Sequence, residues 1–519
     1  MVFLSNAVSN ARIEEVNSKG ELHHDSVGTT VYGTRWASED IPRFDLPQDE
    51  MPSSKYMHVA YRLIKDDLAL DGNPALNLAT FVTTYMEEEA EKLMAENLSK
   101  NFIDYEEYPQ SVELCNRCVN MIARLYHAPM DSAEQEALGC STVGSSEAII
   151  LATLAMKRRW QNARKEKGLP TDKPNLVLGA NCQVAWHKAV EYLEIEAREV
   201  ECTEDCLCMD PHKAAELVDE NTIGVCAILG STYTGHYEDV KTLNDLLEEK
   251  NKENGWDVGI HVDAASGGFV APFVVPELEW DFRCSRVVSI NVSGHKYGMT
   301  YAGVGWCIWR SPEYLPKSLV FNINYLGSEQ ASFTLNFSKG AAHVIAQYYV
   351  LIRLGRNGFR KIMSNLTATA DHLAARLKAT GYFEIMSETG GRGLPLVAFR
   401  LKEKHHFNEF DISSKLRERG WIVPAYTMAP KVEHLKMLRV VVREDFSRSR
   451  CEILVKDIIA AVRALESVDE ENINKRREHI EKHSLTSLHA SHEATYKPKT
   501  DDGADAETTE EPKAAKGIC

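Results

Sequence analysis

The amino-acid sequence predicts an α/β protein with a mostly parallel central sheet. Between residues 112 and 310, helical stretches alternate with short runs of β-branched apolar residues. Such alternation over about 200 residues indicates parallel strands whose connecting helices cover both faces of the sheet. A smaller α+β unit follows, and a charged segment poor in apolar residues comes last. In a sheet of this kind, ligands bind at the carboxyl ends of the strands.

Hydrophobic periodicity and turn residues place the individual elements. An arm rich in glycine and proline precedes a short helix at residues 57–68, and a second helix is expected after residue 81, running to about residue 98. Further helices are expected at residues 112–127, 145–167, 186–197, 211–219, 240–252 and 338–379. Apolar β-branched runs lie at residues 175–179, 223–230, 258–263, 286–290 and 305–309, and the smaller unit has apolar runs at 394–400, 421–424 and 437–443.

These patterns divide the chain into four parts. Residues 1–75 form an N-terminal arm and helix, which has no core of its own and is expected to pack on another subunit. Residues 76–365 form the large domain, and residues 366–466 form a smaller C-terminal domain. Residues 467–519 form a charged tail, for which the low apolar content predicts disorder.

Composition argues against several classes of function. The 519 residues carry a formal net charge of −17, which argues against a nucleic acid as partner because phosphate binding needs an excess of Lys and Arg. No apolar stretch is long enough to span a membrane, and the first residues do not resemble a signal peptide. The 12 cysteines lack a spacing that completes a zinc site, so reduced thiols in the cytoplasm are expected.

Three separated features carry the candidate chemistry. Small residues at 144–146 open an amphipathic helix, where free N–H groups can hold a phosphate; simple helix capping by Ser145 is the alternative. Asp263 ends an apolar strand, where a buried carboxylate needs a partner such as a helix N-terminus or a protonated ligand nitrogen. Lys296 follows another such strand, although a lone lysine there is usually just exposed to solvent.

The order of these three features predicts a site for pyridoxal phosphate. Residues 144–146 would hold the phosphate, Asp263 would keep the ring nitrogen protonated, and Lys296 would bind the aldehyde as a Schiff base. Each feature alone has an ordinary structural explanation. Three unrelated explanations would have to coincide in this order, so the combined interpretation is favoured.

Several motifs between residues 57 and 465 resemble the glutamate decarboxylases, in the bacterial, plant and fungal branch of the pyridoxal-phosphate group II decarboxylases. The motifs include Asn77-Leu-Ala-Thr-Phe81, Glu107-Tyr-Pro-Gln-Ser111, Gly144-Ser-Ser-Glu-Ala148, His261-Val-Asp-Ala-Ala-Ser-Gly-Gly268 and Ser293-Gly-His-Lys-Tyr-Gly298. The resemblance implies the aspartate aminotransferase-like fold, fold type I, in a homodimer or a higher homo-oligomer. It also implies α-decarboxylation of L-glutamate to 4-aminobutyrate and CO2, through the Lys296 Schiff base and a quinonoid intermediate.

The resemblance also implies roles for individual residues. Asp263 pairs with the ring nitrogen, Gln183 stacks over the ring, Ala265 lies against its other face, and Thr232 lies near the ring hydroxyl. The implied phosphate ligands are Ser145, Ser146 and His295, with Ser338 supplied by the neighbouring subunit and with Ser293 as a small residue that lets the backbone approach. The implied substrate residues are Thr80, Phe81, Asn101 and Asp104 around the distal carboxylate, and Arg439 near the α-carboxylate.

Two further hypotheses concern acid–base groups. Asp104 beside a substrate carboxylate requires that one of the two carboxyls carries a proton, so glutamate binding should improve at mildly acidic pH. Tyr325 lies in a polar, glycine-containing segment. It either closes over the adjacent subunit's site and helps protonate the quinonoid, or is a surface tyrosine without a role.

Alternatives remain for function and for partners. Another group II decarboxylase or lyase would act on an aromatic or sphingoid substrate, and a non-catalytic regulatory protein would keep the fold without turnover. The basic cluster at residues 474–483 lacks the tryptophan and spaced apolar anchors of a calmodulin target. A solvated charged helix end is therefore the favoured interpretation, and calmodulin binding is the alternative.

Overall fold

A computed structural model describes residue 46 and residues 59–132, 134–323 and 330–483. The chain forms two compact units, Met1–Leu76 and Asn77–Cys519. In the first unit, helix α3 (Val59–Leu68) confirms the short helix expected from the sequence, and a 3-10 turn, η3 (Pro74–Leu76), follows it. All elements described below belong to the second unit.

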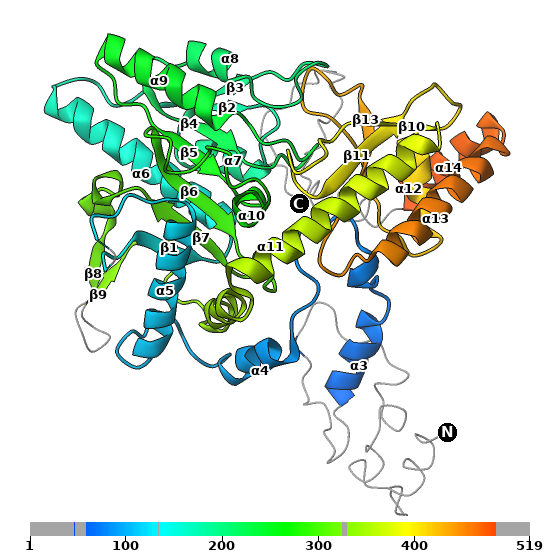
Figure 1. Ribbon diagram of the computed structural model, residues 1–519, viewed down its shortest axis with the longest axis horizontal. Coiled ribbons are helices and arrows are strands. Elements are labelled where there is room, and N and C mark those ends of the chain that lie inside the picture. The colour runs from blue at the N-terminus through cyan, green and yellow to red at the C-terminus, as the bar shows by residue number, and fades with distance from the viewer. Residues whose placement is uncertain (1–45, 47–58, 133, 324–329, 484–519) are drawn as a thin grey trace, which may run out of the picture. The chain divides into compact units, whose positions relative to one another are not determined.

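The second unit contains a seven-stranded sheet in the order β1-β7-β6-β5-β4-β2-β3 (Figure 1). Its strands are β1 (Leu138–Thr142), β2 (Asn175–Gly179), β3 (Glu196–Val200), β4 (Thr222–Ile228), β5 (Ile260–Asp263), β6 (Val287–Ser293) and β7 (Gly305–Trp309). The five strands from β3 to β6 along this order are parallel, and β7 runs antiparallel to both β6 and β1. The predicted α/β fold with a mostly parallel sheet is thus confirmed.

The described helices between residues 77 and 286, the segment that contributes strands β1 to β5, are α4 (Glu88–Glu96), α5 (Pro109–Leu125), α6 (Ser145–Glu166), α7 (Val184–Tyr192), α8 (Pro211–Glu216), α9 (Val240–Asn254) and α10 (Ala271–Val274). Short 3-10 turns lie at η4 (Gly267–Phe269), η5 (Pro312–Tyr314) and η6 (Lys317–Leu319). Ile149 of α6 and Trp186 of α7 pack in one buried cluster with Leu176 and Leu178 of β2. These two helices therefore cover the same face of the sheet.

Two expected helices are shorter than the sequence pattern indicated. The helix expected to follow residue 81 begins only at Glu88, because backbone groups in residues 77–83 bond to other segments instead. The Leu78 N–H donates to the Ile422 carbonyl at 2.9 Å, and the Thr83 N–H donates to the His295 carbonyl at 3.0 Å. The helix expected at residues 186–197 ends at Tyr192, since the edge strand β3 takes up the residues from Glu196 onward.

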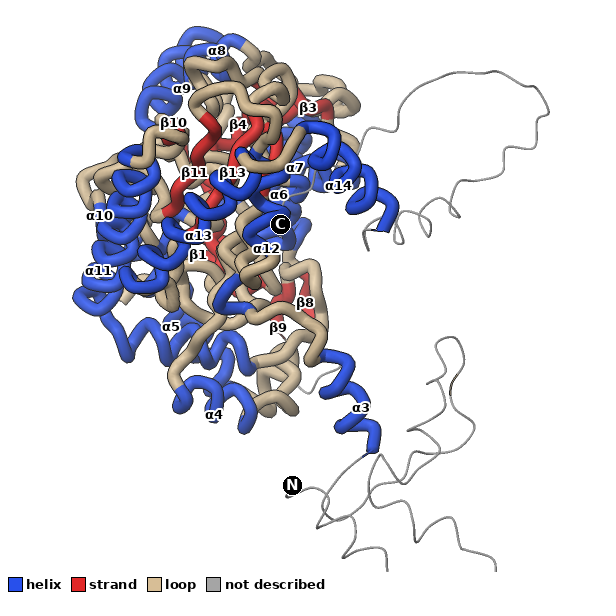
Figure 2. The backbone as a smooth tube through the Cα atoms, turned by 90° about the vertical axis from the view of Figure 1, so that its right-hand side faces the viewer, coloured by secondary structure: helices blue, strands red, loops and turns tan. Residues whose placement is uncertain are grey.

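A second, antiparallel sheet has the order β10-β11-β13-β12, with β11 and β13 side by side (Figure 2). Its strands are β10 (Phe383–Ile385), β11 (Leu396–Leu401), β12 (Ala425–Thr427) and β13 (Lys436–Val441). The helices of the same segment are α12 (Glu409–Arg417) and α13 (Arg448–Glu466). A separate hairpin pairs β8 (Phe321–Ile323) with β9 (Gln330–Ser332). This arrangement matches the α+β character expected for the smaller unit.

The predicted boundary between residues 365 and 366 falls inside the long helix α11 (Ala342–Ala379). This helix packs on α4 and α5 and also on β10, β11 and α13. Its backbone departs from helical geometry at Gly355, where φ is 56° and ψ is −177°. Because one helix serves both sheets, the division expected at residue 365 does not separate independent pieces of chain.

The prediction of a disordered tail from residue 467 is wrong for its first part. Helix α14 (Glu470–His483) continues the fold after α13, and Ile473 is buried. Arg477 donates to both carboxylate oxygens of the buried Asp411, through Nε at 2.9 Å and Nη2 at 2.5 Å. One apolar anchor and this two-point pair hold a helix that composition alone does not indicate. Residues 484–519 lie outside the described residues.

Candidate active site

The carboxyl ends of β5 and β6 bring the predicted features together. The two strands are parallel neighbours, and Asp263 at the end of β5 is paired in register with Asn291 of β6. Lys296 follows β6 by three residues, in the turn after Ser293. The Oγ atoms of Ser293 and Ser145 lie 2.7 Å apart, which joins the start of α6 to the same place. The order of features in the sequence therefore corresponds to one site in space.

Asp263 is buried and is satisfied by three donors. Its Oδ1 accepts hydrogen bonds from the Asn291 amide at 2.9 Å and from the Ala265 N–H at 3.1 Å, and its Oδ2 accepts one from the Trp186 indole at 2.9 Å. The side chain is 3% exposed. Burying a carboxylate costs free energy unless donors of this kind compensate for the lost water. Asp263 thus stands as a fixed, desolvated acceptor at the strand end.

Lys296 lies in a loop that is held from two sides. Its Nζ donates to Ser266 Oγ at 3.3 Å and lies 5.5 Å from the centre of the Phe81 ring. The Gly294 N–H donates to the Val304 carbonyl at 3.0 Å, and the Thr83 hydroxyl donates to the Lys296 carbonyl at 3.0 Å. These bonds position the amine beside Phe81, one of the predicted substrate residues.

The start of α6 has the features expected of an anion site. Gly144 is the N-cap residue and no side chain caps the helix, so the alternative that Ser145 is a plain cap is wrong. Glu147 binds back to the Val143 N–H at 2.8 Å, while the first N–H groups of the helix have no carbonyl partner within it. Ser145 forms the first residue of the helix and Ser146 the exposed second. Such a helix start is a common phosphate site.

His295 adds a second group to this anion site. A Cβ atom on Gly144 would lie 3.1 Å from His295 Cε1, so the ring sits directly beside the helix start. Its Nδ1 is buried and has no hydrogen-bond partner among the described residues. Burial, and secondly the Lys296 charge, lower the pKa of His295 to about 4. A neutral imidazole with an unsatisfied ring nitrogen fits a phosphate group, so the residues present fit pyridoxal phosphate.

The remaining predicted cofactor contacts lie near the same strand ends. Gln183 is the N-cap of α7, one turn before Trp186, and is partly buried. Ala265 follows Asp263 by two residues and gives its N–H to that carboxylate. Thr232 is buried after β4, and its carbonyl accepts a hydrogen bond from Arg439 Nη1. Among the described residues, the backbone carbonyl of Thr232 thus helps to hold the Arg439 side chain.

Arg439 connects the small sheet to the Thr80–Phe81 segment. It is fully buried on β13, and its Nη2 donates to the Ala79 carbonyl at 2.7 Å. Its guanidinium carbon lies 5.0 Å from the centre of the Phe81 ring. Arg443 supports the same segment, since its Nη1 donates to the Thr80 carbonyl at 2.8 Å. The Nε of Arg439 is buried without a hydrogen-bond partner among the described residues, so the side chain keeps donor capacity for a carboxylate.

Two further predicted site residues, Asn101 and Ser338, are hydrogen-bonded to each other. The Asn101 amide donates to Ser338 Oγ at 3.5 Å, and its Oδ1 accepts from the Lys339 N–H at 3.3 Å. Asp104 follows in the turn before α5 and is partly buried. Ser338 also lines a cavity of about 250 Å³ together with Val143, next to the start of α6. Tyr325 lies outside the described residues.

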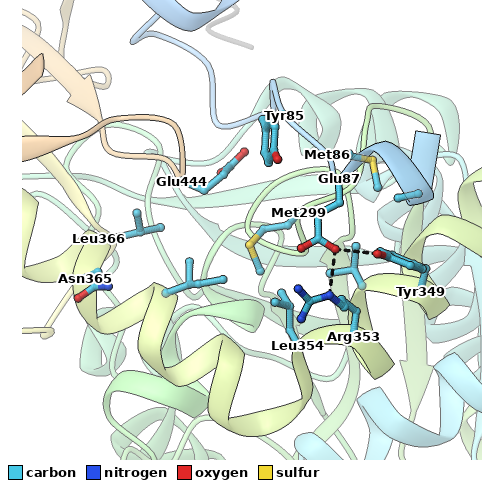
Figure 3. Close-up of a pocket in the computed structure, with 13 residues that line it drawn as sticks. Tyr85, Met86, Glu87, Met299, Tyr349, Arg353, Leu354, Asn365, Leu366 and Glu444 are labelled. Carbon is cyan, nitrogen blue, oxygen red and sulfur yellow. Dashed lines mark hydrogen bonds and ion pairs between the residues drawn. The ribbon is translucent and has the colours of Figure 1, made fainter. Parts of the chain in front are cut away.

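Another cavity, of about 310 Å³, lies beside α4 and the break in α11 (Figure 3). Its lining is largely apolar and includes Met86 and Met299. Glu87 accepts a hydrogen bond from the Tyr349 hydroxyl at 2.7 Å and pairs with Arg353 Nε at 3.1 Å, as Figure 3 shows. None of the predicted site residues lines this cavity. The lining of this cavity is therefore separate from the residues of the candidate active site.

Two kinds of feature are absent from the described residues. They contain no group of three or more His, Cys, Asp or Glu side chains placed to hold a metal ion. Separately, within the part of the chain that the structure describes, no helix has the length and apolar character needed to cross a membrane.

Sequence reasoning missed three polar residues of this site. Trp186 and Asn291 bind Asp263 directly, and Ser289 lies two residues before Asn291 on β6. The signal was present in the sequence, because Ser289, Asn291 and Ser293 alternate with apolar residues in a strand that is otherwise apolar. With the period of two in a strand, these three side chains share one face of the sheet.

Comparison with known proteins agrees with this geometry. Residues 49–402 match the family model described as the pyridoxal-dependent decarboxylase conserved domain. The chain is 56% identical over 439 residues to a glutamate decarboxylase of Petunia hybrida, covering 85% of this chain and 86% of that one. It is 44% identical over 445 residues to a glutamate decarboxylase of Aliivibrio fischeri, covering 85% of this chain and 94% of that one. The solved structure of a Lactobacillus brevis glutamate decarboxylase superposes with a TM-score of 0.80 at 41% identity, covering 85% of this chain and 99% of that one.

Proposed function

The chain belongs to the pyridoxal-dependent decarboxylase family, and we propose that it converts L-glutamate to 4-aminobutyrate and CO2 with pyridoxal phosphate held by Lys296. One observation carries this proposal: Asp263 and the Lys296 loop stand at adjacent ends of parallel strands, joined to an anion-binding helix start through the Ser293–Ser145 contact. The similarity to glutamate decarboxylases over most of the chain supports the choice of substrate.

Each end of the cofactor has residues suited to it. The Lys296 amine would hold the aldehyde carbon, and Asp263 would keep a proton on the ring nitrogen. The first N–H groups of α6, with Ser145, Ser146 and His295, would hold the phosphate. When bound, pyridoxal phosphate supplies an electron sink for the electron pair that remains on the substrate as CO2 departs.

The substrate is proposed to lie between the Thr80–Phe81 segment and Arg439. An arginine that binds the α-carboxylate would fix which bond of the α-carbon stands perpendicular to the plane of the ring. That bond is the one that breaks, so this orientation would select decarboxylation over other reactions. The buried, unpaired Nε of Arg439 supports this role, since it offers a donor in a site from which water is excluded.

We further propose that a second subunit completes each site. Ser338, near the phosphate, and Tyr325 are the residues assigned to this contribution. Sizing of the full chain and of a chain ending at residue 483 tests whether the oligomer depends on the tail, without removing the packed helix α14.

A cytoplasmic location is proposed with this function. Eleven cysteines of the described residues are free thiols, most of them buried. Free thiols in this number are typical of a reducing compartment. Calmodulin binding is not part of the proposal, because Arg476 and Arg477 in the basic cluster pair with Glu418 and Asp411.

The decisive experiment measures CO2 release from L-glutamate by the protein reconstituted with pyridoxal phosphate. The Lys296→Ala variant is expected to lose the cofactor absorbance band and at least about a thousandfold in rate, because it removes the covalent attachment. Lys241→Ala, which removes only an exposed pair with Asp245, is the matched control and should retain both. CO2 release from L-tryptophan or L-tyrosine but not L-glutamate would favour an aromatic substrate. A protein without an absorbance band would contradict the proposal.

A further inference from the structure

A row of buried polar side chains runs across β5 and β6 behind Asp263. His261 and Asp263 are two residues apart on β5, and Ser289 and Asn291 are two residues apart on β6. The register pairs His261 with Ser289 and Asp263 with Asn291, so all four share one face of the sheet. Each of them is 3% exposed or less. Polar groups at such depth require partners, and they find them in one another.

The hydrogen bonds form a continuous chain. Ser289 Oγ lies 2.7 Å from His261 Nδ1, His261 Nε2 lies 2.7 Å from Asn291 Oδ1, and the Asn291 amide nitrogen lies 2.9 Å from Asp263 Oδ1. The indole of Trp186 packs edge-on against the His261 ring at 5.4 Å and donates to Asp263 Oδ2. One aromatic side chain therefore contacts both residues that β5 contributes to the row.

The chemistry of Asp263 fixes the direction of every bond. An ionised carboxylate only accepts, so Asn291 must present its NH2 group to Asp263 and its carbonyl oxygen to His261. That oxygen also only accepts, so His261 carries its proton on Nε2. Burial lowers the pKa of His261, which keeps the ring neutral, and Nδ1 then accepts the proton of the Ser289 hydroxyl. A single tautomer satisfies the whole chain.

These bonds leave one acceptor position on Asp263. Oδ1 accepts from Asn291 and from the Ala265 N–H, which uses both of its lone pairs. Oδ2 accepts from Trp186 and keeps one lone pair. The remaining position on Oδ2 is therefore the one available to a protonated ring nitrogen.

We infer that His261 is a positioning residue, which acts through Asn291 to hold Asp263 with its Oδ2 open to the protonated ring nitrogen of pyridoxal phosphate. This inference rests on the proposed function and deepens it. Without the Nε2 proton of His261, Asn291 Oδ1 would be buried without a donor, and the bond to Asp263 alone would hold the amide. The bond from Asn291 to Asp263 would then be less firmly oriented, so the carboxylate would be held less rigidly and the ring nitrogen would be protonated less completely.

Two amide variants separate this role from simple packing. The side-chain nitrogen of Gln reaches the position of His Nε2, whereas the nitrogen of Asn reaches only that of Nδ1. His261→Gln should therefore retain a donor to Asn291, and His261→Asn should lose it. Val262→Ala is the matched control, since Val262 is fully buried on the same strand with its side chain on the opposite face.

The first measurement is the dissociation constant of pyridoxal phosphate from each apo-protein. The second is the 15N chemical shift of the ring nitrogen in protein loaded with 15N-labelled cofactor. His261→Asn should weaken binding about tenfold or more and move the shift toward that of an unprotonated pyridine, because a hydrogen bond to a charged group is lost. His261→Gln should keep the wild-type 15N shift and a dissociation constant within about threefold of wild type. A threefold change is smaller than the loss of a hydrogen bond to a charged group would produce.

The outcomes distinguish this inference from the proposed function. Equal shifts in His261→Gln and His261→Asn, or a displaced shift in Val262→Ala, would overturn the positioning role while leaving the decarboxylase proposal intact. Failure of wild-type protein to bind pyridoxal phosphate would overturn the function itself. If His261→Asn does not fold, Ser289→Ala provides the second test, since it removes only the donor to Nδ1 and should move the shift in the same direction by less.

Discussion

Replacing Gly294 by alanine should damage the loop that carries Lys296, for a reason visible in the distances. A Cβ atom at this position would lie 2.2 Å from Gln347 Oε1 and 2.8 Å from Val304 Cγ1. Gln347 is fully buried, so its side chain has no solvent-filled space to move into. It accepts from the Trp306 indole at 3.2 Å and donates to the Gly298 carbonyl at 3.1 Å.

Moving Gln347 would break both of these buried hydrogen bonds. Each buried polar group left without a partner costs about 1–3 kcal/mol, and overpacking adds about 1–3 kcal/mol. Gly294→Ala should therefore destabilise the folded protein by about 3–9 kcal/mol, a large part of the 5–15 kcal/mol that is typical of folded domains. It should also lower cofactor affinity, because Gly298 and Lys296 belong to the same loop.

Denaturant-induced unfolding in a double-mutant cycle tests this reasoning. Gln347→Ala removes the side chain that clashes, so adding Gly294→Ala to it should cost much less than in wild type, with a coupling of about 2 kcal/mol or more. Gly340→Ala is the control, since a Cβ there meets nothing within 4 Å. Additive costs in the double variant, or equal costs for Gly294→Ala and Gly340→Ala, would refute the argument.

Two further predictions concern stability. Burial raises the pKa of Glu238 from 4.5 to about 7, so folding favours the protonated form of this side chain. Its contribution to the free energy of unfolding is complete below about pH 4.5 and is lost as the pH rises through about 7. The unfolding free energy of wild type relative to Glu238→Gln should thus fall by about 3 kcal/mol between pH 5 and pH 8 in urea titrations, and a constant difference would contradict the assignment. Arg477→Ala should cost about 1–2 kcal/mol and speed hydrogen exchange in α14, because it breaks a two-point pair with the buried Asp411. Lys475→Ala, which loses only an exposed pair with Glu471, should change little, and equal exchange in the two variants would show that Arg477 does not hold the helix.

The buried strands were predictable because both of their faces are covered. Every residue of β4 and β6 is buried, and both strands are rich in valine and isoleucine, so the expected bounds lie within about three residues of those observed. Strands β1 and β3 were missed for the opposite reason. β3 is an edge strand with exposed Glu196 and Glu199, and β1 combines Gly139 with Ser141. Such residues carry no periodic apolar signal.

The parts of the site that were predicted are those whose chemistry is visible in single residues. Lys296, Asp263 and the small residues at 144–146 each end or begin an apolar element, so their order in the sequence was informative. Trp186 was not predicted, because its bond to Asp263 depends on how α7 packs on the sheet. The assignment of Ser338 to a second subunit stays a prediction, and so do the place of Asp104 near the distal carboxylate and the role of Tyr325.

The polar row behind Asp263 depends on one irregularity in strand pairing. Ile260 is paired with Val287, but the next residue, His261, is paired with Ser289, so Val288 is passed over. Without that extra residue, His261 would be paired with Val288 and Asp263 with Ile290. The side chains of Ser289 and Asn291 would then lie on the opposite face of the sheet from His261 and Asp263. Gly259 makes room for it, because a Cβ there would lie 2.5 Å from Val288 Cγ1. A small residue at 259 is therefore required by the chemistry at 263, and this coupling between backbone register and site could be found only from the structure.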